Sequence, residues 1–127
     1  DNKEALISSY KKLELTSYRD QDTEKINDYI RDHYHEPDIS VEIINAQTGI
    51  ARKRIYDILE KEYRMTFKEL INWLRLEEAK RLLANTDLNV TDIAFRLGYN
   101  SNSYFGRIFK NAEGVSPKEY RDKFSGK

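Results

Sequence analysis

Apolar residues recur along most of the chain at the three- and four-residue spacing of amphipathic helices. The first strong stripe includes Ile26 and Ile30 and predicts a helix from Thr23 to about His35. The segment 36–38 should end this helix, because a residue that precedes proline disfavours helical backbone. No segment alternates apolar and polar residues as a half-buried strand does, so we predict an all-α protein with about seven helices.

A short helix, a glycine turn and a second helix are expected next. Ser40 should cap the short helix, which runs to about Thr48, and Gly49 should supply the turn. The second helix is expected at about Arg52–Tyr63, where three apolar residues share one face: Ile55, Ile58 and Leu59. Thr66 and the glutamate three residues later form a capping box for a further helix that runs to about residue 85. At about 1.5 Å per residue, this linker helix should span roughly 28 Å.

The same pattern then starts again. Asn89 should cap a short helix, Gly98 should turn the chain, and Asn100 or Ser101 should cap the helix that follows. That helix repeats the apolar stripe of the first copy: Phe105, Ile108 and Phe109. A serine and a proline at 116–117 should begin the last helix.

These two stretches form an internal repeat. Gly49 and Gly98 are 49 residues apart, and the apolar stripes and the capped helix starts match at an offset of 50. Each copy has the plan of a helix-turn-helix, whereas the alternative is two plain helix pairs of a bundle. A pair of motifs that read DNA needs its second helices about 34–36 Å apart, which is roughly the reach of the linker helix.

The charges are balanced in number but uneven along the chain. Lys and Arg together number 22, as do Asp and Glu, so the formal net charge is zero. Residues 1–48 carry 6 basic and 11 acidic side chains, and residues 49–127 carry 16 basic and 11 acidic ones. This asymmetry indicates an acidic leading segment and a mildly basic working segment. No apolar run approaches the roughly 18 residues that a membrane span needs.

The sequence contains little that would support catalysis. The absence of cysteine excludes disulfides, cysteine-rich zinc sites and thiol chemistry. His33 and His35 are two residues apart, whereas a zinc pair on a helix needs a spacing of four. Glu77 and Glu78 are adjacent, so they cannot flank one substrate. We therefore expect no enzymatic activity, no cofactor and no metal.

The outward faces of the two second helices differ. In the second copy the face combines amide, hydroxyl and guanidinium groups, which suit base edges, and residues 95–112 contain no acid. In the first copy Asp57 and Glu60 share the outward face with the cations. A carboxylate at this position repels DNA unless it accepts a hydrogen bond from cytosine. We therefore expect phosphate anchoring by the first copy and leave base reading by it open.

Four stretches resemble the DNA-binding domain of AraC/XylS-family bacterial transcription regulators: LEEAKRLL at 76–83, VTDIAFRLGY at 90–99, SYFGRIFK at 103–110 and GVSPKEYR at 114–121. The resemblance covers about residues 23–124. It implies two helix-turn-helix subdomains joined by a long linker helix, with both recognition helices in adjacent major-groove segments on one face of DNA. Asn45 and Ala51 depart from the family pattern in the first motif.

The resemblance, together with the outward faces, also predicts the contact residues. Base contacts are expected from Asn102, Ser103, Gly106, Arg107, Lys53, Tyr56 and Asp57. Phosphate contacts are expected from Arg52, Arg54, Ser101 and Lys110.

The predicted organisation has four parts: a connector from a missing upstream domain at 1–22, a first helix-turn-helix subdomain at 23–66, the linker helix at 67–85 and a second subdomain at 86–127. We predict a cytoplasmic, sequence-specific DNA-binding effector domain of a larger transcription regulator. Its expected partners are double-stranded DNA, RNA polymerase and an upstream sensing or receiver domain, with no membrane contact. The alternative is a helical protein–protein interaction module without DNA affinity, which the 9 tyrosines would suit.

Overall fold

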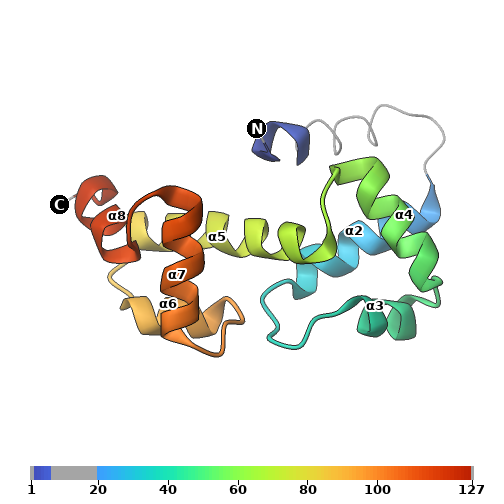
Figure 1. Cartoon of the computed structure of the whole chain (residues 1–127). Helices are drawn as coiled ribbons and strands as arrows, with labels where there is room; N and C mark the ends of the chain where they lie inside the picture. The colour runs from blue at the N-terminus through green and yellow to red at the C-terminus, as the bar shows by residue number, and fades with distance from the viewer. Residues whose placement is uncertain (1, 7–19, 127) are drawn as a thin grey trace. The chain divides into compact units, whose positions relative to one another are not determined.

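The computed structural model describes residues 2–6 and 20–126, and helices α2 to α8 are labelled in Figure 1. Residues 2–6 are helical. From residue 20 onward the described helices are α2 (Gln21–His33), α3 (Val41–Thr48), α4 (Arg52–Tyr63), α5 (Phe67–Asn85), α6 (Val90–Arg96), α7 (Asn102–Glu113) and α8 (Pro117–Phe124). Every regular element in the described ranges is a helix, which confirms the all-α prediction. Most of the predicted connector, residues 1 and 7–19, lies outside the described residues.

The boundaries of α2 differ from the predicted ones at both ends. The helix begins at Gln21 rather than Thr23, because the Asp20 carboxylate accepts a hydrogen bond from the Asp22 amide at 2.9 Å and so caps the helix. It ends at His33 rather than two residues later, where the following segment leaves the helical path.

The described chain divides into two compact units, each with its own core. The first comprises Asp1–His33 and Ile39–Trp73, and the second comprises Tyr34–Asp38 and Leu74–Lys127. The division crosses α5, so that each unit contains part of this helix. The segment between α2 and α3 belongs to the second unit.

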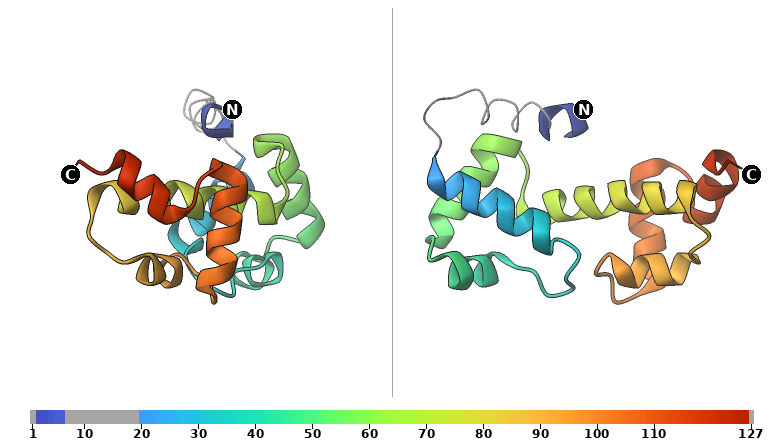
Figure 2. Two further views of the ribbon diagram at one scale, coloured as in Figure 1. Left: turned by 60° about the vertical axis from the view of Figure 1, so that its left-hand side comes forward. Right: turned by 180° about the vertical axis from the view of Figure 1, so that it is seen from behind.

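In the first unit α3 packs against both α2 and α4, as the views in Figures 1 and 2 show. The core consists mainly of isoleucines that are almost fully buried: Ile26, Ile30, Ile44, Ile55 and Ile58. The turn between α3 and α4 has Gly49 in the left-handed region with φ of 76°. Asn45 donates from Nδ2 to the Ile50 carbonyl at 2.7 Å across this turn. This bond gives a structural reason for the departure of Asn45 from the family pattern.

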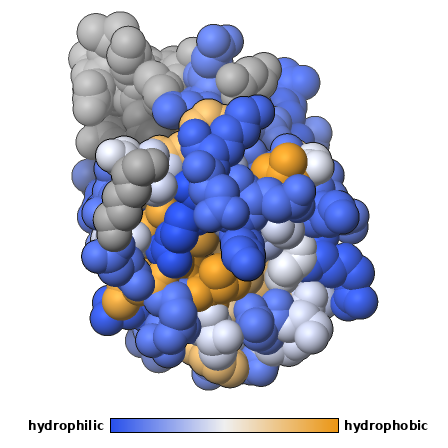
Figure 3. All heavy atoms as spheres, turned by 90° about the vertical axis from the view of Figure 1, so that its left-hand side faces the viewer, coloured by the Kyte–Doolittle hydropathy of each residue, from blue (hydrophilic) through white to orange (hydrophobic). Residues whose placement is uncertain are grey.

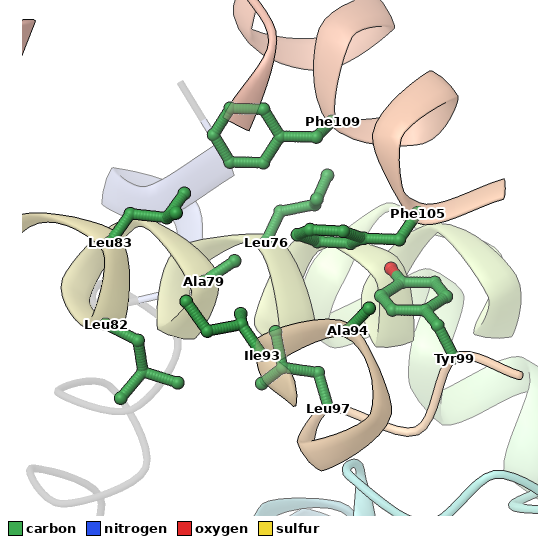
Figure 4. Packing of buried hydrophobic residues seen from close by; sticks show 10 residues of the cluster. All are labelled: Leu76, Ala79, Leu82, Leu83, Ile93, Ala94, Leu97, Tyr99, Phe105 and Phe109. Carbon is green, nitrogen blue, oxygen red and sulfur yellow. The ribbon is translucent and has the colours of Figure 1, made fainter. Parts of the chain in front are cut away.

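In the second unit one aromatic and aliphatic cluster joins α5, α6 and α7 (Figure 4). The cluster contains Leu76, Ala79, Leu82, Leu83, Ile93, Ala94, Leu97, Tyr99, Phe105 and Phe109. Phe105 and Phe109 are fully buried, and their ring centroids lie 5.9 Å apart. Because both rings come from one side of α7, the core fixes which residues of that helix face outward.

A buried cation secures the segment 34–38 within this unit. The Arg75 side chain is only 7% exposed and donates from Nε to the Tyr34 carbonyl and from Nη2 to the Glu36 carbonyl, each at 2.8 Å. Its guanidinium carbon also lies 5.0 Å from the centroid of the Tyr99 ring. These contacts hold the segment that follows α2 against α5. Burial lowers the pKa of Arg75.

Candidate nucleic-acid interface

The second motif consists of α6, the turn at Gly98 and α7. Gly98 has φ of 98°, which a residue with a side chain rarely adopts. Ser101 caps α7, since its hydroxyl oxygen accepts from the Tyr104 amide at 3.1 Å. Of the two caps considered from the sequence, Ser101 is therefore the one used. The predicted phosphate contact Ser101 thus also has a capping role.

The outward face of α7 carries the predicted contact residues of this motif. Asn102, Ser103, Arg107 and Lys110 are exposed, opposite the buried phenylalanines. Arg107 and Lys110 make no ion pair within residues 20–126. The Arg107 guanidinium carbon lies 5.5 Å from the centroid of the Tyr104 ring, which orients the side chain without neutralising its charge. Hydrogen bonds from Ser116 and, to a lesser extent, the charge of Lys110 lower the pKa of Glu119, so Glu119 offsets part of the Lys110 charge. Among the described residues, the face therefore presents one unpaired guanidinium, Arg107, and one partly offset ammonium, Lys110, to a partner.

Gly106 lies in the middle of this face. A Cβ atom built at Gly106 would meet no heavy atom within 4 Å, apart from the nearby backbone of its own helix. A glycine inside a helix lowers its stability by about 1 kcal/mol relative to alanine, and nothing in the fold requires one here. The only acid of α7, Glu113, points elsewhere: it pairs with Lys80 at 3.5 Å.

The first motif has the same plan but a different charge arrangement. Each cation in the first turn of α4 has a carboxylate nearby. Lys53 pairs with Asp57 at 3.2 Å, and the nearest Arg52–Glu42 distance is 3.9 Å. Arg54 is held by two acids at the start of α2. Ala51, at the N-cap, makes no side-chain capping bond.

The predicted base-contact residues of α4 are all on its surface. Tyr56 is 51% exposed, and Lys53 and Asp57 are also exposed, next to each other. Asp57 therefore does not stand as an isolated negative charge, and its lysine partner offsets part of the expected repulsion. The acids that hold Arg54 were missed from the sequence, where they were assigned to the connector. The D-x-D-T pattern at residues 20–23 is typical of a helix N-terminus and could have indicated that these acids begin α2.

The described residues contain no cluster of metal-ligand side chains and no membrane-spanning helix. Within residues 2–6 and 20–126 no three His, Asp or Glu side chains gather as metal ligands would. None of the described helices combines the length and the apolarity that crossing a membrane requires. Figure 3, seen from the side where α8 lies in Figure 1, shows mostly hydrophilic residues around a central apolar area.

Comparison with known families decides the class of these motifs. A family model described as a helix-turn-helix domain matches residues 44–123, which span both motifs. The chain belongs to the AraC/XylS-type helix-turn-helix family. Family membership makes it a DNA-binding domain of a transcription regulator and not a member of an enzyme family.

Relatives and solved structures agree with this assignment. The chain is 36% identical over 94 residues to the xylose operon regulatory protein of Escherichia coli K12. The matched region covers 74% of this chain but 24% of that protein. It is 32% identical over 102 residues to an uncharacterized HTH-type transcriptional regulator of Staphylococcus aureus strain MSSA476, covering 80% of this chain and 14% of the relative. The chain thus spans less than a quarter of the length of these curated relatives.

Among solved structures, the chain resembles the C-terminal domain of AraT, a response regulator from Geobacillus stearothermophilus. The TM-score is 0.78 at 30% identity, over 83% of this chain and 87% of that one. The DNA-binding domain of AdpA, solved in complex with a target DNA, matches with a TM-score of 0.73 at 24% identity, over 80% of this chain and 91% of that one. This second likeness shows a shared fold.

Proposed function

We propose that the chain recognises a specific double-stranded DNA sequence by placing α4 and α7 in the major groove, each in its own segment. The observation that supports this proposal most strongly is the outward face of α7, where Arg107 and Lys110 are exposed and make no ion pair among the described residues. Arg107 has the geometry for a bidentate bond to guanine, and Asn102 has the groups that adenine requires. Gly106 allows the helix backbone to approach the base edges closely.

The contact residues divide into base-reading and positioning ones. We assign base contacts to Asn102, Ser103, Gly106 and Arg107 of α7, and to Lys53 and Tyr56 of α4. Asp57, which the sequence places among the base contacts, we assign instead as a charge that faces the DNA beside Lys53 and repels phosphates. Phosphate contacts are assigned to Arg52, Ser101 and Lys110, because phosphate contacts fix the register of a protein on DNA. The hydroxyl of Ser101 accepts a bond from the helix and still has its own proton to donate. Arg54 is considered separately below.

The larger regulator is also part of this proposal. The curated relatives are four to seven times longer than the matched region, and one similar structure is the C-terminal domain of a response regulator. We therefore infer an upstream sensing or receiver domain and contact with RNA polymerase when the domain is bound at a promoter. Its place would be the cytoplasm, where bacterial DNA is transcribed.

Selection of duplexes from a random pool by the 127-residue chain tests this proposal. The expected result is a bipartite, non-palindromic motif, since the two motifs repeat head to tail in one chain. Binding to the selected duplex should weaken steeply as salt rises, because phosphate contacts release counterions. Enrichment of no sequence, with no affinity for random DNA at low salt, would contradict the proposal and favour a protein-interaction module.

A further inference from the structure

The first turn of α4 is poorly stabilised by its own residues. Its N-cap, Ala51, provides no side-chain acceptor, and the first turn contains no acid. It has instead three consecutive cations: Arg52, Lys53 and Arg54. The N-terminus of a helix carries a partial positive charge, so that cations there are unfavourable. The start of this recognition helix therefore needs negative charge from elsewhere in the fold.

Two carboxylates at the start of α2 supply that charge. Asp20 uses one oxygen to cap α2 and the other to accept a hydrogen bond from Nη2 of Arg54. Asp22 adds a second carboxylate, whose Oδ2 lies 3.4 Å from Nε of Arg54. The hydrogen bonds to Asp20 and Asp22 raise the pKa of Arg54. A single guanidinium thus joins the first turns of two helices that are more than 30 residues apart in sequence.

The position of Arg54 around α4 separates it from the other two cations. Arg54 precedes the buried Ile55 and faces the start of α2, whereas Lys53 pairs with Asp57 along the outward face. A guanidinium that bonds two carboxylates has fewer donors left for a phosphate, and the two acids would repel that phosphate.

We propose that Arg54 is a positioning residue for DNA recognition, which holds the first turn of α4 through Asp20 and Asp22 rather than by binding a phosphate. This inference rests on the proposed DNA-binding function and replaces the sequence-based expectation for Arg54. Its consequence is that the start of α2 controls how well ordered the base-facing residues of α4 are. A change upstream of Asp20 that displaces its carboxylate would therefore loosen the first motif.

Neutral variants of the acids separate the two roles, because they predict effects of opposite sign. Asp20→Asn keeps a good helix cap and removes the charge. If Arg54 is a positioning residue, the double variant Asp20→Asn/Asp22→Asn should bind the selected duplex about threefold to tenfold more weakly, and Arg54→Gln should do the same. The triple variant should bind the selected duplex only slightly more weakly than the double acid variant or Arg54→Gln alone, because all of these changes break the same interaction. If Arg54 instead binds a phosphate, the double variant should bind more tightly, which would overturn the inference.

The salt dependence of binding supplies the matched control. Arg52→Gln removes a cation of the same turn that is assigned to a phosphate, so it should lower the salt slope by about one unit. Arg54→Gln should leave the slope unchanged and relax sequence preference only in the DNA segment bound by α4. A slope lowered equally by both variants would refute the positioning role.

Hydrogen exchange distinguishes failure of this inference from failure of the proposed function. In the Asp20→Asn/Asp22→Asn variant without DNA, amides in the first two turns of α4 should exchange faster, whereas those of α7 should not change. Unchanged exchange in α4 would contradict the coupling even if DNA binds. A wild-type chain that enriches no duplex would refute the DNA-binding proposal, and the exchange result would still decide whether the coupling exists.

Discussion

Replacing Gly106 with alanine should strengthen the fold and weaken DNA binding. The added methyl group would meet no protein atom within 4 Å beyond the local helix backbone, so the substitution causes no clash in the free protein. Alanine also loses less backbone entropy than glycine on entering a helix. We therefore expect a gain in unfolding free energy of about 0.5–1 kcal/mol. For a unit of this size, the gain corresponds to a rise of about 2–8 °C in the unfolding temperature.

The expected effect on DNA binding has the opposite sign. If the backbone at Gly106 packs against base edges, a methyl group must push the helix away or be compressed, at a cost of about 1–3 kcal/mol. Thermal unfolding followed by circular dichroism measures the first effect, and titration of the selected duplex measures the second. A variant that is more stable and binds as tightly as the wild type would refute the close approach of α7. A variant that is less stable would contradict the open space around Gly106.

Four further predictions concern single side chains. Gly98→Ala should destabilise the second unit by about 2–4 kcal/mol, because φ is 98° and the new Cβ would lie 2.7 Å from the His35 carbonyl oxygen. Thermal unfolding measures this loss, and a loss of unfolding free energy below about 1 kcal/mol would contradict the prediction. Arg107→Ala should cost about 1–3 kcal/mol on the selected duplex and relax one base pair, whereas Lys110→Ala should weaken all duplexes alike and lower the salt slope by about one unit. Asp57→Ala should strengthen binding to selected and scrambled duplexes alike, since it removes a charge that repels phosphates; weaker binding to the selected duplex alone would show that Asp57 reads cytosine. Ser116 is the N-cap of α8, and the hydrogen bond from its backbone amide lowers the pKa of Glu119. The stability that this bond adds should therefore be present above pH 4.5 and be lost as the pH falls further, and Glu119→Gln, compared with the wild type by unfolding temperature, should remove that pH dependence.

Local signals made much of the fold predictable. The observed α4 has the expected bounds, and α5 begins directly after Thr66 and ends at the expected residue. The predicted capping box is present, since Thr66 and Glu69 exchange hydrogen bonds of 2.8 and 3.1 Å. Such features depend on residues within one turn of each other, and they leave a readable spacing in the sequence. The outward face of α7 could be predicted for the same reason, because the aromatic stripe fixes its orientation.

Contacts between distant residues could not be predicted in this way. Arg75 looks like one more charged residue of an amphipathic helix, yet it is buried and bonds carbonyls 39 and 41 residues earlier in the chain. Backbone carbonyls leave no trace in the residue pattern, so the sequence holds no sign of this partner. The pairing of Arg54 with Asp20 is also long-range and depends on how α2 and α4 pack. Sequence-based reasoning therefore placed the end of α2 two residues too late and did not anticipate the pairing of Arg54 with Asp20 and Asp22.

The pairing of charges also explains how a chain of zero net charge can bind a polyanion. Net charge describes the whole surface, but binding depends on the charges that face the DNA and are not neutralised by neighbours. In α4 the cations of the first turn have acids close by, so this turn contributes little net positive potential. In α7 neither cation makes an ion pair among the described residues, although Glu119 offsets part of the Lys110 charge, and the single acid of the helix pairs with Lys80. Electrostatic attraction to phosphates should therefore come mainly from the second motif, while the first motif depends on the alignment of its paired side chains.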